Sequence, residues 1–217
     1  MRLAAAIQQQ MNVSVKLAEL MKDPTVRGLA HLIDQESDSG IALKATELKD
    51  YYPLSENQKG VYVDWEMNRE ALQYNIPSTY KFADKDAGRL SAEVRSVIDA
   101  HPYMKTRLAM VDGEAKQQRR YEAETIVEDI VLTNEPDAAY FQQFVRPFDL
   151  FNDDLYRIKV VKAPSAVYLF MDIHHIIFDG MSTALFLGEI LAAYDGTEPQ
   201  KETITAFDFA EYDHQIA

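Results

Sequence analysis

Two adjacent histidines, His174 and His175, are the residues of this sequence best suited to acid–base chemistry. They follow residues 167–173, a short, mostly apolar run rich in β-branched and aromatic side chains, which predicts a buried strand. Asp179 and Gly180 close the segment, and apolar residues at helical spacing follow them. We therefore expect a strand, a loop that carries the histidines, and a helix.

This local pattern supports a catalytic and a structural interpretation. A helix N-terminus near the loop disfavours protonation of an imidazole, and neutral imidazole is the form that acts as a base near pH 7. Side chains alternate along a strand, so at most one of the two histidines faces a reactive cavity, and a buried histidine is more often part of a core. Asp179 either caps the following helix or pairs with a cation. We expect no metal site, since no third ligand stands at recognisable spacing and cysteine is absent from the sequence.

Composition narrows the class of protein. The chain has 217 residues, 47% of them hydrophobic and 26% charged, which suits a globular protein with one sizeable core and a small appendage. Its net charge of −13 repels phosphate backbones and anionic lipids, so we expect neither nucleic acid nor a membrane as a partner. The lack of cysteine fits a reducing cytoplasm. The N-terminus is a poor signal peptide, and no apolar run approaches the ~18 residues of a membrane span.

The chain divides into three parts. Residues 1–35 predict short helices, with Asp23 as the N-cap and Pro24 as the first helical position of the second one. They are too few to bury a core alone. Residues 36–50 are polar and read as a linker, and residues 51–217 form the main domain. Both ends lack a helix boundary signal, so we expect a fragment of a longer protein.

Local signals within the main domain predict its elements. Ser55 with Gln58 three residues later forms a capping box, which places a helix start. Asp112–Gly113 and residues 163–165 are turns of two hairpins, and Pro77 places its strand at an edge or a bulge. These hairpins and the intervening helices predict an α+β fold, with a mixed, largely antiparallel sheet and packed helices. Helices are also expected over residues 84–100, from Asn134 or Asp137 to about 145, and over 204–217, with a strand over 126–132.

The segment HHIIFDG at 174–180 resembles the HHxxxDG motif of the condensation domains of nonribosomal peptide synthetases, which belong to the chloramphenicol-acetyltransferase-like acyltransferases. This resemblance extends over residues 51–217 and implies the N-terminal lobe of a two-lobed domain, whose active site is a tunnel between the lobes. Four further segments are similar to family motifs and come in family order: YPLSENQKGVY at 52–62, HPYMKTRL at 101–108, RPFDL at 146–150 with the following LYRIKVV, and FDFAEYD at 207–213.

Residues 1–35 resemble the last helices of a peptidyl carrier domain, and carrier, linker and condensation domain is the usual order in these synthetases. The carrier serine would precede residue 1, because the first serine, Ser14, lies in the wrong place. The resemblance implies donor and acceptor carrier domains and the C-terminal lobe as partners. It implies no directly bound cofactor, because the phosphopantetheine arms of the carriers bring the substrates.

The implied reaction is amide formation, in which an acceptor amine on one carrier attacks a thioester on another. The candidate catalytic residues are His175, His174 and Gly180, of which the family favours His175, as a base or as a hydrogen-bonding partner of the amine. His174 is expected to be mainly structural. Gly180 either leaves room and offers its N–H, or meets a steric need at the helix start. This fragment alone should be inactive; alternatives are a non-catalytic carrier-docking scaffold, a stand-alone acyltransferase, or an epimerisation domain of the same superfamily.

One position departs from the family pattern. Many members have an arginine directly before the histidine of the second motif, a candidate partner for the motif aspartate, whereas this chain has Ala100 there. Lys105 and Arg107 remain nearby in the sequence. We therefore predict that Asp179 has an architectural role and pairs with Lys105 or Arg107.

Overall fold

The structure is a computed structural model that describes residues 22–36 and 44–216. It divides into two compact units, Met1–Lys44 and Ala45–Ala217. The expected first helix and residues 37–43 of the expected linker lie outside the described residues.

The first unit contains helix α3 (Val26–Glu36). The expectation that Asp23 caps this helix and Pro24 begins it is wrong. The hydroxyl of Thr25 accepts the hydrogen bond from the backbone N–H of Gly28 at 3.0 Å, so Thr25 is the capping residue. Asp23 instead accepts a hydrogen bond from that hydroxyl at 2.8 Å, which orients the cap.

A four-stranded sheet forms the centre of the second unit, in the order β2 (Asn75–Phe82), β7 (Val167–His174), β6 (Tyr156–Lys162) and β5 (Glu128–Val131). The β2–β7 and β7–β6 pairs are antiparallel, whereas β5 runs parallel to β6. The predicted mixed, largely antiparallel sheet is therefore confirmed. Strand β2 lies at an edge, where Pro77 removes no hydrogen bond from the interior of the sheet, as its sequence predicted.

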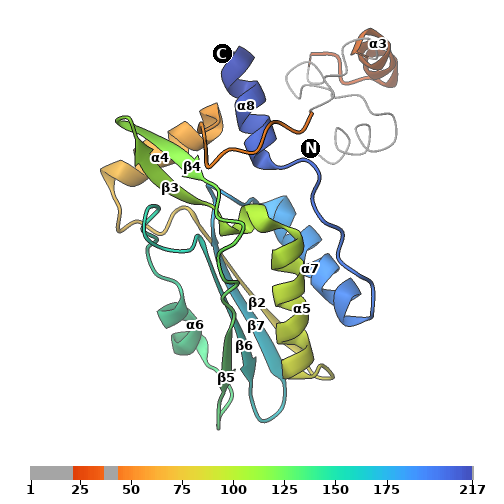
Figure 1. The fold of residues 1–217 in the computed structure, drawn as a ribbon. Coiled ribbons are helices and arrows are strands. Elements are labelled where there is room, and N and C mark those ends of the chain that lie inside the picture. Colours follow the sequence, from red (N-terminus) through yellow and green to blue (C-terminus); the bar gives the residue numbers. More distant parts are fainter. Residues whose placement is uncertain (1–21, 37–43, 217) are drawn as a thin grey trace. The chain divides into compact units, whose positions relative to one another are not determined.

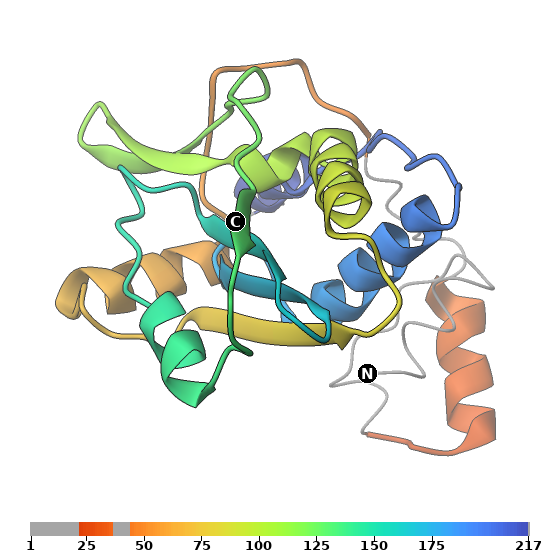
Figure 2. The ribbon, with the colours of Figure 1, turned by 90° about the horizontal axis from the view of Figure 1, so that it is seen from below.

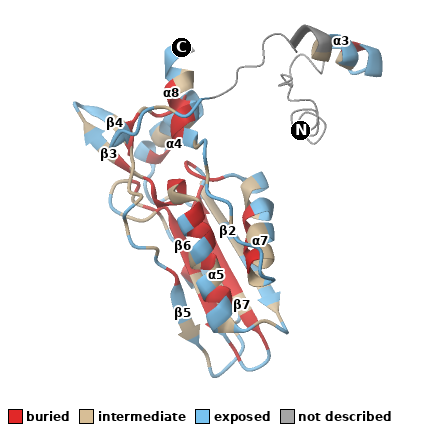
Figure 3. Ribbon diagram, turned by 45° about the vertical axis from the view of Figure 1, so that its right-hand side comes forward, coloured by how far each residue is buried: buried red, intermediate tan, exposed pale blue. Residues whose placement is uncertain are grey.

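Helices cover both faces of this sheet (Figure 1 and Figure 2). Helices α5 (Ala87–Ala100) and α7 (Gly180–Tyr194) pack on one face, and the short helix α6 (Ala138–Phe144) packs on the other. Successive residues of β7 serve the two layers in turn: Leu169 belongs to the large core and Phe170 to the smaller cluster with Phe144. Strand β7 is consequently buried along almost its whole length, and it is red in Figure 3.

A second, three-stranded antiparallel sheet has the order β1 (Tyr51–Tyr52), β4 (Glu114–Gln118) and β3 (Arg107–Val111). The predicted Asp112–Gly113 turn joins β3 to β4, and both residues have positive φ, 54° and 82°, as a type I′ hairpin turn requires. The 3₁₀ helix η1 (Pro102–Lys105) connects α5 to β3. This connection brings the segment after α5 next to the end of β7.

Two of the remaining helices begin at caps that the sequence predicted. The capping box of Ser55 and Gln58 is present at the start of α4 (Glu56–Met67), with both of its hydrogen bonds. Asp137, one of the two residues proposed from the sequence, caps α6. Helix α8 (Ala206–Ile216) packs through Phe207, whose ring stacks on Tyr52 with centroids 4.4 Å apart. The α+β class is confirmed.

Candidate functional site

His174 and His175 lie in different environments. His174 is the last residue of β7 and is 2% exposed, whereas His175 begins the following turn and is exposed. The backbone N–H of His175 donates to the carbonyl of Tyr74 at 2.8 Å, and the two side-chain rings meet edge to face at 6.4 Å. As the alternation along a strand predicts, one histidine of the pair is buried and the other is exposed.

The surroundings of His174 keep it neutral. Burial, followed by the charges of His175 and Arg157, lowers its pKa to about 4. Its Nδ1 accepts a hydrogen bond from the backbone N–H of Ile176 at 3.1 Å, which leaves the ring proton on Nε2. The ring of Phe148 lies edge-on to the imidazole at 5.6 Å. His174 thus fixes the shape of the turn that presents His175.

His175 lines a cavity of about 430 Å³. The walls come from the histidine turn, the start of α4, η1, the first turn of α7 and α8. Besides His175, the polar and aromatic residues that line it are Ser55, Asn57, Gln58, Tyr103, Phe178, Asp179, Ser182 and Phe209.

Gln58 holds the turn that follows His175. Its Nε2 lies 2.9 Å from the carbonyl oxygen of Ile176, 3.0 Å from the hydroxyl of Tyr103 and 3.0 Å from Oε1 of Gln117. The hydroxyl of Tyr103 donates to Gln117 Oε1 at 2.7 Å. Sequence reasoning identified Gln58 as half of a capping box and as part of the family-like segment at 52–62, but it did not predict these contacts. Its other partners lie 45 to 118 positions away, and no local pattern indicates them.

Asp179 caps helix α7. Its Oδ1 accepts hydrogen bonds from both the backbone N–H and the hydroxyl of Ser182, each at 2.7 Å. Burial acts to raise the pKa of this carboxyl, but the hydrogen bonds from Ser182 outweigh it and hold the pKa below its usual value. A Cβ built at the neighbouring Gly180 meets no heavy atom within 4 Å, so no steric contact with the described residues requires a glycine there.

The expected ion pair of Asp179 with Lys105 or Arg107 is wrong. Lys105 in η1 pairs with Asp99 at 2.8 Å, while Arg107 on β3 pairs with Asp154 at 2.8 Å. Among the residues that the structure describes, Asp179 has no Lys or Arg nitrogen at ion-pair distance. Its architectural role is fulfilled by its own helix.

A buried polar network that the sequence did not reveal joins β7 to the two strands beside it, β2 and β6. Asp172 is fully buried, and it accepts hydrogen bonds from Nδ2 of Asn75 on β2, at 2.8 and 3.1 Å, and from Nη1 of Arg157 on β6, at 3.3 Å. Burial raises the pKa of Asp172 despite these partners. The Arg157 guanidinium lies 3.6 Å from the ring centroid of Phe148, the residue that packs on His174. The sequence holds one signal of this network, since Asp172 stands within the otherwise mostly apolar run of residues 167–173.

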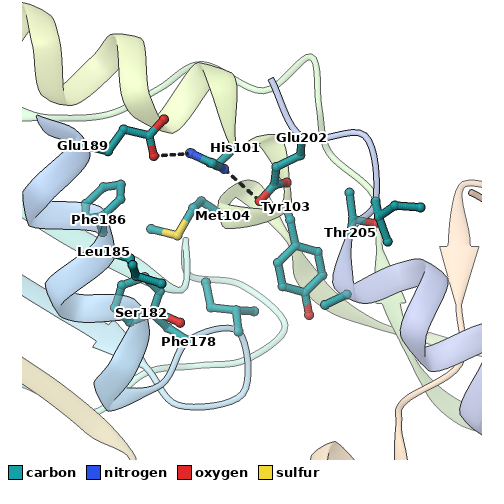
Figure 4. Close-up of a pocket in the computed structure, with 13 residues that line it drawn as sticks. His101, Tyr103, Met104, Phe178, Ser182, Leu185, Phe186, Glu189, Glu202 and Thr205 are labelled. Carbon is teal, nitrogen blue, oxygen red and sulfur yellow. Dashed lines mark hydrogen bonds and ion pairs between the residues drawn. The ribbon is translucent and has the colours of Figure 1, made fainter. Parts of the chain in front are cut away.

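A second cavity, of about 300 Å³, adjoins the first (Figure 4). His101 bridges two carboxylates there: Nε2 lies 2.6 Å from Oε2 of Glu189, and Nδ1 lies 2.9 Å from Oε1 of Glu202. The hydrogen bond with Glu202 raises the pKa of His101 most, burial opposes it, and Glu189 raises it further, to about 9. The ring is therefore a cation at pH 7, and sequence reasoning did not foresee this arrangement.

The described part of the chain shows neither a metal-binding cluster nor a membrane-spanning helix. In residues 22–36 and 44–216, no group of three or more His, Asp or Glu side chains is placed to hold a metal ion. Within the same ranges, every helix is too short or too polar to cross a membrane.

Comparison with known proteins places these features in a family. Residues 48–217 match the Condensation domain family. The chain is 32% identical over 213 residues to bacitracin synthase 3 of Bacillus licheniformis, covering 97% of this chain and 3% of that protein. It is 31% identical over 219 residues to surfactin synthase subunit 2 of Bacillus subtilis (strain 168), covering 99% of this chain and 6% of that protein. The chain therefore spans a small part of the length of the curated relatives it matches.

Solved structures share the fold. The starter condensation domain of rhizomide synthetase RzmA superposes with a TM-score of 0.66 at 21% identity, over 77% of this chain and 44% of that one. The X-domain from teicoplanin biosynthesis superposes with a TM-score of 0.68 at 20% identity, over 81% of this chain and 40% of that one. The predicted fold, a chloramphenicol-acetyltransferase-like half of a condensation domain, is thus confirmed. By its sequence over residues 48–217, this chain belongs to the condensation-domain family of the nonribosomal peptide synthetases.

Proposed function

We propose that this chain is part of a nonribosomal peptide synthetase and supplies the histidine-bearing half of a condensation domain. That domain would form an amide bond between a carrier-bound thioester and the amine of a second carrier-bound substrate. The observation that carries the proposal is the exposed His175 in the wall of a cavity of about 430 Å³, at the end of an otherwise buried strand.

The chemistry needs one well-placed polar group. The amine nitrogen attacks the thioester carbonyl, the carbon–sulfur bond breaks, and the proton that the amine loses ends on the released thiol. His175 is proposed to accept that proton, or to hold the amine by a hydrogen bond while it attacks. Both roles need a fixed backbone beneath the imidazole. This is supported by the hydrogen bond from the His175 N–H to the Tyr74 carbonyl and by that from Gln58 Nε2 to the Ile176 carbonyl. His174 is assigned a supporting role, because it is buried and neutral.

Two further residues of the motif receive roles from their environment. Asp179 is proposed to fix the start of α7, through its hydrogen bonds with Ser182. Gly180 is proposed to leave space beside the reacting groups, since a Cβ there has no neighbour within 4 Å. Lys105 and Arg107 are assigned to the frame of the domain, where they pair with Asp99 and Asp154.

The domain order is also proposed. Residues 1–35 would be the last helices of a carrier domain, residues 36–50 a linker and residues 51–217 the N-terminal lobe. Similarity to the two synthases over 97% and 99% of this chain, beyond residues 48–217, supports the first two assignments. The partners would be the donor and acceptor carriers, with their phosphopantetheine arms, and the C-terminal lobe. Without that lobe the chain should not turn over, and a cytoplasmic location remains an expectation.

The test uses a protein that contains the whole condensation domain, with both carriers loaded. His175→Ala should lower the rate of amide formation, measured by mass spectrometry of the carrier-bound product, by about 10²–10⁴-fold. His214→Ala is the matched control, because His214 is exposed in the last turn of α8 and lies outside the cavity. Unchanged amide formation in His175→Ala would overturn the role given to His175, and a lack of amide formation in the unmutated protein would favour a carrier-docking scaffold.

A further inference from the structure

The two cavities share part of their walls. The cavity of about 430 Å³ that His175 lines and the cavity of about 300 Å³ beside His101 are both bordered by Tyr103, Ile177, Phe178 and Ser182. The two cavities are therefore neighbours, and a group held at His175 lies in the one that adjoins the second cavity. In an amino acid the side chain leaves from the carbon that bears the amine, so a bound acceptor amine places its side chain within reach of this space.

The body of the second cavity is apolar and partly open. Met104, Ile177, Phe178, Leu185, Phe186 and Ile204 contribute to its walls. Leu185 and Ile204 are 71% and 40% exposed, although both are large apolar side chains. An apolar stem that entered the cavity would cover them, and burial of that surface would favour binding.

The far end of the cavity is charged. Figure 4 shows His101, Glu189 and Glu202 together at one end, and Phe178 and Ser182 at the other. Two carboxylates face one imidazole, and neither lysine nor arginine is among the described residues that line the cavity. The raised pKa of His101, about 9, keeps the ring protonated at pH 7, so this end carries an excess of one negative charge.

We propose that the cavity beside His101 is the side-chain pocket for the acceptor amino acid, and that it selects an apolar stem ending in a cation or a hydrogen-bond donor. An acidic side chain is disfavoured, because its carboxylate would enter a partly desolvated space that already has excess negative charge. An ornithine-like or lysine-like side chain fits this pattern, since its methylene stem contacts the apolar walls and its ammonium group reaches Glu189. This assignment rests on the proposed condensation reaction and adds the class of its acceptor.

The test compares acceptors in a protein that contains the whole condensation domain. The probes are the N-acetylcysteamine thioesters of ornithine, leucine and glutamate, with one donor-loaded carrier throughout. Glu189→Gln keeps the shape of the side chain and an oxygen that can accept a hydrogen bond from His101, but it removes one negative charge. We expect the ratio of kcat/KM for ornithine over glutamate to fall on the order of tenfold, equivalent to about 1.4 kcal/mol. Leucine should change least, because it ends in no charge.

Glu198→Gln is the matched control, because Glu198 is exposed, lies in the segment between α7 and α8 that also carries Glu202, and does not line the cavity. An equal change of the ornithine to glutamate ratio in both variants, or no change in either, overturns the pocket assignment. A second variant, Leu185→Trp, tests the space itself. It should lower kcat/KM for ornithine and leucine but spare the thioester of alanine, and an equal loss for all three acceptors would contradict the assignment.

These outcomes are separable from the proposed function. His175→Ala tests whether the domain forms the amide bond at all, whatever the acceptor. Binding of the ornithine and glutamate thioesters to the His175→Ala protein, measured by isothermal titration calorimetry, tests the pocket without turnover. Tighter binding of ornithine that disappears in His175→Ala/Glu189→Gln supports the pocket, and equal affinities for the two thioesters refute it.

Discussion

Replacing His101 with glutamine should remove a stabilising contribution that depends steeply on pH. The imidazole bridges Glu189 and Glu202 and so ties α7 to the segment that precedes α8. Its pKa is raised from 6.5 to about 9 on folding. A group with a raised folded-state pKa stabilises fully below its unfolded pKa, and this stabilisation is lost as the pH rises through the folded-state pKa. The relevant window therefore runs from about pH 6.5 to about pH 9.

The magnitude follows from these two pKa values. The protonated ring contributes about 2.5 kcal/mol to the free energy of unfolding at pH 7 and about 0.4 kcal/mol at pH 9. The side chain is 24% exposed, so screening by solvent reduces the difference between the two pH values to roughly 1–2 kcal/mol. His101→Gln lacks the titrating ring, so its free energy of unfolding should not show this decrease between pH 7 and pH 9.

The assay is urea unfolding of the wild type and His101→Gln at pH 6, 7 and 9. Fluorescence of Trp65, the single tryptophan, reports the transition. Other titrating groups contribute equally to both proteins, so the difference in the free energy of unfolding isolates His101. This difference should shrink by roughly 1–2 kcal/mol from pH 7 to pH 9, and His214→Gln, at an exposed position, should show no such trend. A difference that stays constant across this range would refute the reasoning.

Two more predictions concern the frame of the site. Arg157→Met should lower the free energy of unfolding by about 3–5 kcal/mol, because it leaves the fully buried Asp172 without its cation; a loss below about 1 kcal/mol in urea unfolding would contradict the network. Asp179→Ala should cost about 1 kcal/mol and Asp179→Asn much less, because asparagine also caps helices. Equal losses in these two variants, or coupling to Lys105→Ala in a double-mutant cycle, would contradict the capping role.

Local signals account for most of what the sequence predicted. The capping box at Ser55, the turn at Asp112–Gly113 and the buried run before His174 each depend on neighbours in the chain, and the structure confirms all three elements. The placement of Pro77 at a sheet edge was predicted for the same reason, since proline cannot donate to an interior ladder.

Predictions that needed the identity of a distant partner were less successful. Asp179 was assigned a cation because Lys105 and Arg107 lie within the family-like segment at 101–108, yet each of them pairs with another carboxylate. His101 bridges Glu189 and Glu202, which follow it in the chain by 88 and 101 positions. Such pairs are fixed by the packing of helices on the sheet, which hydrophobic periodicity alone does not determine.

The order of strands in the central sheet has a consequence for how the chain folds. Strand β7 pairs with β6 through a short hairpin, but it meets β2 across a long stretch, since Asn75 and Asp172 are 97 positions apart. Closing such a long loop is entropically costly and slow, so β2 should dock after the hairpin has formed. His175 acquires its position only in that late step, because the carbonyl of Tyr74, just before β2, holds its backbone N–H. During synthesis β2 leaves the ribosome well before β7, so it is unpaired until β7 has been made. Pro77 limits the pairing of β2 with strands of other chains during this time.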